Sequence, residues 1–239
     1  MPLINRYKKY KKLNIGCGWD KRKGYLNIDV DPNCKPDLLI VDNDFSKIPK
    51  DNFEEILAND VLEHITHAQT LSVLLDWAEY LNKNGKLKLQ TSNILGVAKQ
   101  MNKSSKFENQ VGWTICLFGN QAHPGDFHHI GFTETTLKVN LLAAGFKIVK
   151  FEEKDNWLFN VVAKKSYLWT DVITDNAELT DEEFTDKLFM EAFGRKPDEL
   201  GGQHILGGLQ SGELSRYDAT KHLYSSRERL YYTAKKNKL

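Results

Sequence analysis

The chain has 239 residues, of which 41% are hydrophobic and 27% are charged, a composition typical of a globular protein with a buried core. It excludes a disordered chain, a collagen and a coiled coil. The 33 basic and 32 acidic residues leave a formal net charge of +1, which gives no overall field to attract a nucleic acid or an acidic membrane. Short apolar runs predict no membrane span, and three cysteines at unrelated spacings favour a reducing cytoplasm.

The first quarter of the chain predicts strands rather than helices. Short apolar runs predict four strands, at residues 13–15, 25–30, 38–41 and 55–58. The first two strands flank a glycine turn, Gly16-Cys17-Gly18, and only six residues separate this turn from the second strand. A parallel crossover normally needs a dozen residues or more, so we expect the helix between these strands to be vestigial.

Helices and strands alternate in the region that follows. Apolar residues at helical spacing predict a helix over 69–81, and Asn84-Gly85 then turns the chain into an alternating strand at 86–90. After an irregular stretch, the pattern predicts a helix over 133–144 and two strands, at 146–151 and 159–163. This alternation indicates an α/β fold: a Rossmann-like, mostly parallel seven-stranded sheet whose final short-looped pair is antiparallel.

A second unit is predicted near the C-terminus. The pattern dissolves after residue 165, and Thr180 with Glu183 then forms a capping-box signature ahead of an apolar periodic segment. Glycines divide the remainder into short helical segments, which indicates a small all-helical module of three or four helices. The predicted division is a main domain over 1–165, a linker over 166–179 and a helical accessory domain over 180–239.

Several ordered motifs carry a resemblance to a known family. In chain order they read LNIGCG, LNIDVDP, VDNDF, FEEILANDVLEHI and LNKNGKLKLQTSN, and together they span much of residues 11–165. This series resembles the class I S-adenosylmethionine-dependent methyltransferases, particularly small members in which LNIGCG is followed almost at once by an NxD strand. The resemblance implies the methyltransferase fold, S-adenosylmethionine as cofactor and methyl transfer as activity.

The resemblance also implies which residues hold the cofactor. Gly16, Cys17 and Gly18 would line its methionine and ribose part, with Cys17 as a small side chain that fits the turn. Asp29, at the end of the second strand, would accept hydrogen bonds from the ribose hydroxyls. The resemblance leaves open whether Asp42 or Asp44 reaches the adenine amino group, and it places Asn59 near the transferred methyl group. No metal is implied.

The loop QAHPGDFHHIGFT, ahead of the 133–144 helix, holds the candidates for acid–base chemistry. In the resembled family a histidine at this place often faces the active site, and His129 fits that pattern better than His128. A neutral imidazole there would take a proton from a hydroxyl acceptor. Two alternatives stay open: a solvated or capping histidine, and a metal site that combines this loop with His64 and His67.

Other residues near these motifs have both a structural and a functional interpretation. Glu63 is explained by the dipole of the helix that it would begin, and Asp60 either lines the site or caps that helix. Three aromatic residues would wall an acceptor pocket or form a small core of their own: Trp113, Phe118 and Phe127.

The C-terminal unit contains GRKPDELG and, later, LQSGELSR. It resembles a bacterial helical domain of unknown function with a GRxPDxxG step, which accompanies glycan-related proteins. We expect residues 180–239 to serve protein docking or self-association. The predicted activity of the whole chain is methyl transfer to the hydroxyl of a small molecule, sugar or glycan. The alternatives are a non-catalytic nucleoside-binding scaffold of a glycan-assembly complex and an RNA or protein methyltransferase, although nothing between the basic termini favours a nucleic-acid partner.

Overall fold

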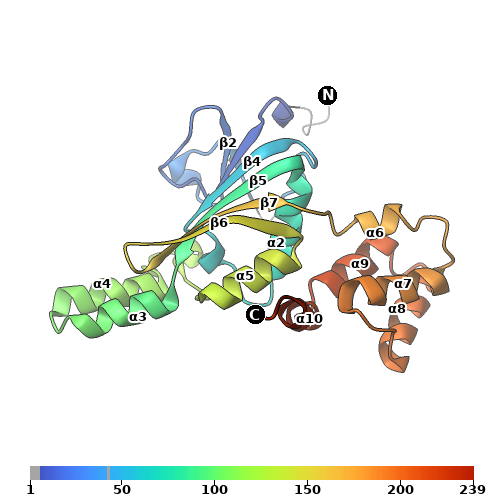
Figure 1. Ribbon diagram of the computed structural model, residues 1–239. Coiled ribbons are helices and arrows are strands. Elements are labelled where there is room, and N and C mark those ends of the chain that lie inside the picture. The colour runs from blue at the N-terminus through green and yellow to red at the C-terminus, as the bar shows by residue number, and fades with distance from the viewer. Residues whose placement is uncertain (1–5, 42–43) are drawn as a thin grey trace.

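The computed structural model describes residues 6–41 and 44–239, and its centre is a seven-stranded sheet (Figure 1). The strand order is β3-β2-β1-β4-β5-β7-β6, and only β7 runs antiparallel to its neighbours. The bounds are β1 (Lys12–Ile15), β2 (Tyr25–Asp29), β3 (Leu38–Leu39), β4 (Phe53–Asn59), β5 (Leu81–Ser92), β6 (Phe146–Lys154) and β7 (Leu158–Lys165). The structure therefore confirms the predicted α/β class and the antiparallel final pair.

The sheet has an apolar face and a more polar face. In β5, Leu87 and Leu89 are buried on one face, whereas Lys86 on the other face is exposed. The buried face packs against α2 (Thr70–Tyr80) and α5 (Glu134–Ala143), which contact each other. The hydrophobic core therefore lies between the sheet and these two helices.

The connection between β1 and β2 contains turns and no helix, as predicted. Two buried asparagines, which lie side by side in the parallel register, hold this connection. The Asn14 amide donates to the Asp20 carbonyl oxygen and to Asn27 Oδ1, both at 3.0 Å. Asn27 Oδ1 also accepts from the Arg22 backbone N–H at 2.7 Å, and the Asn27 amide donates to Asp37 at 2.8 Å. These side chains satisfy the backbone of the segment that stands in place of a helix.

The predicted turn at Asn84-Gly85 lies within β5 as a bulge. Phe53 pairs with Leu81 and Glu55 pairs with Lys86, so residues 82–85 loop out from the ladder. A cavity of about 440 Å³ opens beside this bulge and Asp51, at the edge of the sheet opposite the glycine turn.

The stretch between β5 and α5 is more regular than the sequence indicates. It contains two helices, α3 (Ile94–Lys103) and α4 (Phe107–Phe118), and the short 3-10 helix η3 (Pro124–Asp126). The prediction of an irregular stretch was wrong: Phe107, Val111, Ile115 and Phe118 recur at helical spacing in α4, although none of its side chains is buried. In Figure 1 the pair α3 and α4 projects away from the sheet.

The C-terminal part is helical throughout, with α6 (Asp171–Thr174), α7 (Asp181–Phe193), α8 (Glu199–Ser211), α9 (Arg216–Tyr224) and α10 (Arg227–Asn237). The capping box at the start of α7 is present: the Thr180 hydroxyl accepts from the Glu183 backbone N–H, and the Glu183 carboxylate accepts from the Thr180 backbone N–H. α6 lies inside the segment 166–179.

These C-terminal helices pack on the outer side of α2. The buried Trp169 donates from its indole N–H to the Leu75 carbonyl oxygen at 3.3 Å. Tyr217 donates to the buried Glu79 carboxylate at 2.9 Å, and Lys221 pairs with a carboxylate of the same helix, Asp76, at 2.6 Å. α2 is thus a middle layer, with the sheet on one side and the helical part on the other.

The buried guanidinium of Arg229 joins three further elements. It donates to the carbonyl oxygens of Ala143, at the end of α5, and of Glu191 and Ala192, at the end of α7. It also donates to the Tyr167 hydroxyl. A cation at the C-terminal ends of two helices is favoured by their dipoles, so this contact holds α5 and α7 together. Within the described ranges, no helix has the length and apolar character needed to cross a membrane.

Candidate functional site

The glycine turn after β1 is shaped for a close approach to a ligand. Gly16 and Gly18 have φ angles of +58° and +47°, in the region that favours glycine. A Cβ at Gly16 would lie 2.5 Å from the Val61 side chain, so this position has no room for a larger residue. A Cβ at Gly18 would meet nothing within 4 Å, so the backbone there faces open space that a ligand can enter.

Asp29 ends β2 directly beside this turn. Its carboxylate accepts from the Gly18 backbone N–H at 2.7 Å through one oxygen and from the Asp31 backbone N–H at 2.9 Å through the other. These two bonds fix the orientation of the carboxylate and leave a lone pair on each oxygen. Asp29 can therefore accept further hydrogen bonds from two neighbouring hydroxyl groups.

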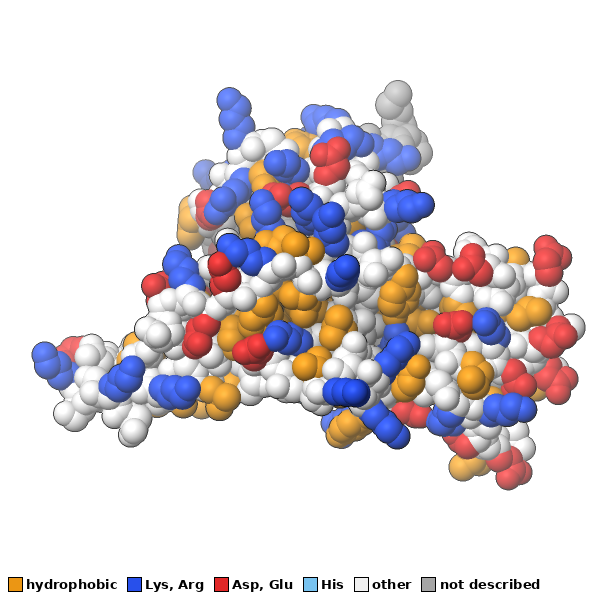
Figure 2. Space-filling model, in the orientation of Figure 1, with side chains coloured by type: hydrophobic (Ala, Val, Ile, Leu, Met, Phe, Trp, Pro, Cys, Tyr) orange, Lys and Arg blue, Asp and Glu red, His pale blue; other side chains and the backbone are white. Residues whose placement is uncertain are grey.

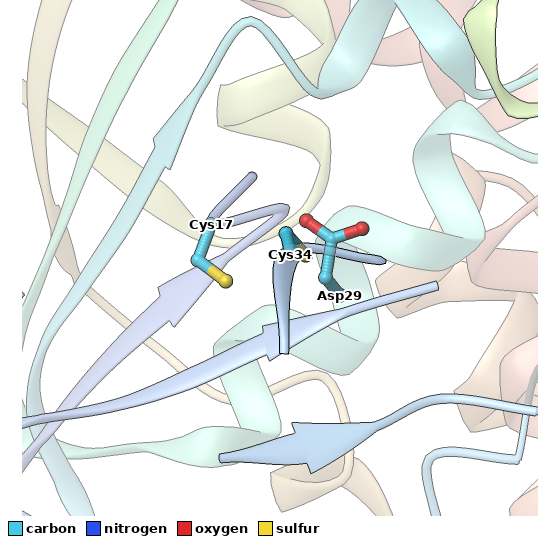
Figure 3. A group of neighbouring side chains, drawn as sticks. All are labelled: Cys17, Asp29 and Cys34. Atoms are coloured by element: carbon cyan, nitrogen blue, oxygen red, sulfur yellow. The ribbon is translucent and has the colours of Figure 1, made fainter. Parts of the chain in front are cut away.

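Two cysteines flank Asp29. Figure 3 shows the Cys17 side chain pointing toward Cys34 and Asp29, and the ligand atoms of the three residues lie within 4.8 Å of one another. Burial and the nearby Asp29 carboxylate raise the pKa of the Cys17 thiol to about 12, and burial also raises the pKa of Cys34. Both side chains therefore stay protonated and act as small apolar walls unless a soft cation displaces their protons.

The end of β4 adds polar groups to the same edge of the sheet. Asn59 is half-buried and lies opposite Gln90 in the parallel register. The Gln90 amide donates to the Asp60 carboxylate at 3.0 Å. Burial raises the pKa of Asp60, while the Gln90 hydrogen bond and the nearby His128 ring act against that shift. The sequence left the role of Asp60 open; in the structure it lines this edge.

Glu63 differs from its sequence interpretation. It lies in η2 (Leu62–His64), a 3-10 helix of three residues, and its side chain is 2% exposed. The Thr91 hydroxyl donates to its carboxylate at 2.9 Å. Burial raises the pKa of Glu63 to about 7, the reverse of what a helix dipole would do. Burial, not a helix dipole, therefore sets the direction in which the pKa of Glu63 shifts.

The loop histidines lie over this region. His128 is half-buried; its Nδ1 lies 3.1 Å from the Cys116 carbonyl oxygen, and its ring meets the edge of the His64 ring at 4.7 Å. His129 is exposed, and its ring stacks on Phe127 at 6.3 Å, while its backbone N–H donates to the Glu63 carbonyl oxygen. An Nδ1–H bonded to a carbonyl leaves Nε2 of His128 as a proton acceptor.

Asp42 and Asp44 were the two candidates for the adenine amino group. Asp42 lies outside the described residues. Asp44 is exposed, and its carboxylate accepts from the Ser46 backbone N–H at 2.9 Å within its own loop, which lowers its pKa. In the part of the chain that the structure describes, no histidine joins a group of three or more potential metal ligands.

The aromatic residues of the insertion form no core of their own. Trp113 meets Trp157, from the β6–β7 turn, edge to face at 5.6 Å, whereas Phe118 and Phe127 are exposed. Phe127 therefore has an open face beside His129.

Three residues of the site were not predicted: Cys34, Gln90 and Cys116. Each comes from a different segment, and each is placed by the fold rather than by a local motif. Gln90 alone had a usable signal, since it ends a predicted parallel strand and such ends meet at one edge of the sheet.

Comparisons with known proteins found a family model that matches the C-terminal part of the chain and solved structures that resemble about 70% of the chain. Residues 171–231 match the model of a domain of unknown function, DUF4214, and the match begins inside the predicted linker. None of the curated proteins matches the chain.

Among solved structures, the neighbours include S-adenosylmethionine-dependent methyltransferases. A 1,6-didemethyltoxoflavin-N1-methyltransferase from Burkholderia thailandensis, with bound 1,6-didemethyltoxoflavin and S-adenosylhomocysteine, is 13% identical, covers 70% of this chain and 79% of its own, and gives a TM-score of 0.43. A methyltransferase from Methanosarcina mazei is 18% identical (69% and 97% covered, TM-score 0.44). One from Archaeoglobus fulgidus is 15% identical (68% and 91% covered, TM-score 0.44).

The buried Glu63 predicts a specific pH dependence of stability. Its folded-state pKa of about 7 lies above the ordinary 4.5, so the folded chain keeps a proton that the unfolded chain releases. The contribution of this proton to the free energy of unfolding is fully present below pH 4.5. It is lost as the pH rises through 7, and the loss amounts to roughly 3 kcal/mol. We expect Glu63→Gln to remove this loss, as measured by urea unfolding across that range. The exposed Glu54→Gln is the control, and a wild-type pH profile in Glu63→Gln would contradict the assignment.

Proposed function

We propose that the chain binds S-adenosylmethionine along the edge formed by the glycine turn, Asp29 and Asn59, and transfers its methyl group to a hydroxyl of a small molecule, sugar or glycan. The observation that carries this proposal is the Asp29 carboxylate, fixed by two backbone N–H groups beside the open face of Gly18. A ribose diol needs two oriented acceptor oxygens next to backbone that it can approach closely.

The residues present fit this cofactor. Gly16 and Gly18 supply backbone without side chains, and Asp29 supplies the acceptors for the ribose. Asn59 would lie near the methionine end, and Asp44, or Asp42 outside the described residues, would reach the adenine. The bound cofactor would supply a methyl group already activated on a sulfonium. The chain then has to align the acceptor and remove its proton.

The contacts of the two loop histidines favour His128 as the base. Its Nδ1 lies within hydrogen-bond distance of a carbonyl oxygen, and its ring is half-buried. Asp60 is close enough to interact electrostatically with the ring. These features orient an imidazole and stabilise it once protonated. His129, which the sequence favours, has an exposed ring beside Phe127, a position suited to contact with the acceptor.

The proposed organisation keeps the boundaries drawn from the sequence: a cofactor-binding domain over 1–165, a linker over 166–179 and an accessory domain over 180–239. The three free cysteines support a cytoplasmic location. The proposed role of the accessory domain is docking or self-association. Its helices also cover the carboxylates of α2, so removing it would expose Asp76 and Glu79.

Asp29→Ala tests cofactor binding. Losing hydrogen bonds to a charged acceptor costs ~1–3 kcal/mol, so we expect affinity for S-adenosylmethionine to fall by roughly five- to 150-fold in titration calorimetry. The exposed Asp186→Ala on α7 is the matched control and should bind as the wild type does. If Asp29→Ala binds normally, Asp29 is not in the site; if the wild-type chain does not bind at all, the proposed function is wrong.

A comparison of His128→Ala with His129→Ala tests the base. Once an acceptor is found, loss of a general base lowers kcat by roughly 10²–10⁴-fold with cofactor affinity unchanged. We expect this loss in His128→Ala and a smaller change, mainly in KM, in His129→Ala. The reverse order would restore His129 as the base. Wild-type turnover in both variants would leave alignment alone as the source of catalysis. Cofactor binding without product would indicate a scaffold.

A further inference from the structure

The α3–α4 pair, residues 94–118, forms an arm that carries an uncovered apolar stripe. Every third or fourth residue of α4 contributes to it, and the exposed fractions are 75% for Phe107, 40% for Val111, 39% for Ile115 and 54% for Phe118. This spacing places the four side chains on one side of the helix, over a length of about 16 Å. Stripes of this size are rarely left in water without a partner.

The charges of the arm are mainly basic. Lys99, Lys103 and Lys106 are exposed, and the single carboxylate of the arm is that of Glu108. Lys103, Lys106 and Phe107 gather where α3 turns into α4, at the end of the arm far from the sheet. Figure 2 shows basic and apolar side chains together on this projecting part. This local excess of positive charge contrasts with the near neutrality of the whole chain.

The base of the same arm borders the candidate site. The Cys116 carbonyl oxygen contacts His128, and the thiol of Cys116 is close enough to Asp60 for that carboxylate to raise its pKa, although burial is the larger cause. Trp113 rests against Trp157 and fixes the arm to the β6–β7 turn. Whatever binds the stripe is therefore brought next to His128.

We propose that this arm docks on a lipid bilayer with anionic headgroups, with the stripe among the acyl chains and the lysines against the headgroups. An amphipathic helix with apolar residues on one side and lysines beside them binds an anionic bilayer surface in this way. A protein partner fits less well, because a stable interface covers about 800 Å² on each side and the stripe is one side chain wide. If the proposed function holds, docking would present the site to an acceptor carried by the bilayer.

The test is sedimentation of the full chain with vesicles of phosphatidylcholine containing about one third phosphatidylglycerol, without cofactor. We expect binding that is absent with phosphatidylcholine alone and that is released at about 0.5 M salt. Phe107→Ser with Ile115→Ser should weaken binding by roughly tenfold or more, as should Lys103→Glu with Lys106→Glu.

Matched controls lie in the accessory domain. Leu200→Ser replaces an apolar side chain that is 80% exposed, and Lys196→Glu reverses an exposed charge; both should bind as the wild type does. Circular dichroism checks that all variants are folded. Failure of the wild type to bind anionic vesicles overturns the proposal. The proposal is also overturned if the wild type is a dimer and Phe107→Ser is a monomer, because a second copy of the chain then covers the stripe. Vesicle binding by a chain that does not bind S-adenosylmethionine would reject the proposed function and leave the docking intact.

Discussion

The Asn27 side chain is the contact on which the site depends. No helix connects β1 to β2, and three polar contacts of Asn27 hold the connection instead. They are made to Asn14 on the neighbouring strand, to the Arg22 backbone N–H in the connection, and to Asp37 beyond β2. Because Asn27 lies two residues before Asp29, the same bonds that hold the connection also set the end of β2 beside the glycine turn. An apolar residue at either asparagine position would remove the side-chain partner of a backbone group in the connection, the Asp20 carbonyl oxygen or the Arg22 N–H.

The polar character of the second face of the sheet follows from the same short connection. A helix between β1 and β2 would cover this face, and without it the strands carry charged residues there. Glu55, for example, pairs with Lys88 at 2.7 Å and with the Tyr25 hydroxyl. The core is built on the other face alone, and the chain adds a layer beyond α2 and α5. Glu79 and Arg229 are buried only because that layer exists.

The sequence predicted the central strands, the glycine turn, α2 and α5 because each carries a local signal. Leu13 and Ile15 alternate with Asn14, and Thr133 caps α5 with its hydroxyl. The α3–α4 arm was not predicted, although Phe107, Val111, Ile115 and Phe118 recur at helical spacing in α4. Trp113, Cys116 and Leu117 lie away from these four residues, so the apolar side chains of α4 are not confined to one face and its periodicity is weak.

The site was predictable where it lies on strand ends and unpredictable where it depends on packing. Gly16, Gly18 and Asp29 come together as expected from parallel strands whose ends meet at one edge. The burial of Glu63 and the contact between His128 and Cys116 need the arm and the loop in place, and neither has a sequence signal. For the same reason the sequence favoured His129, whereas the contacts favour His128.

The proposed function requires the adenosyl group of the cofactor to lie against Asp29 and the glycine turn. A crystal structure of the chain with S-adenosylhomocysteine tests it directly. We expect both ribose hydroxyls within hydrogen-bond distance of the Asp29 carboxylate and the thioether sulfur on the side of Asn59 and His128. A ligand bound elsewhere, or a ribose turned away from Asp29, would contradict it.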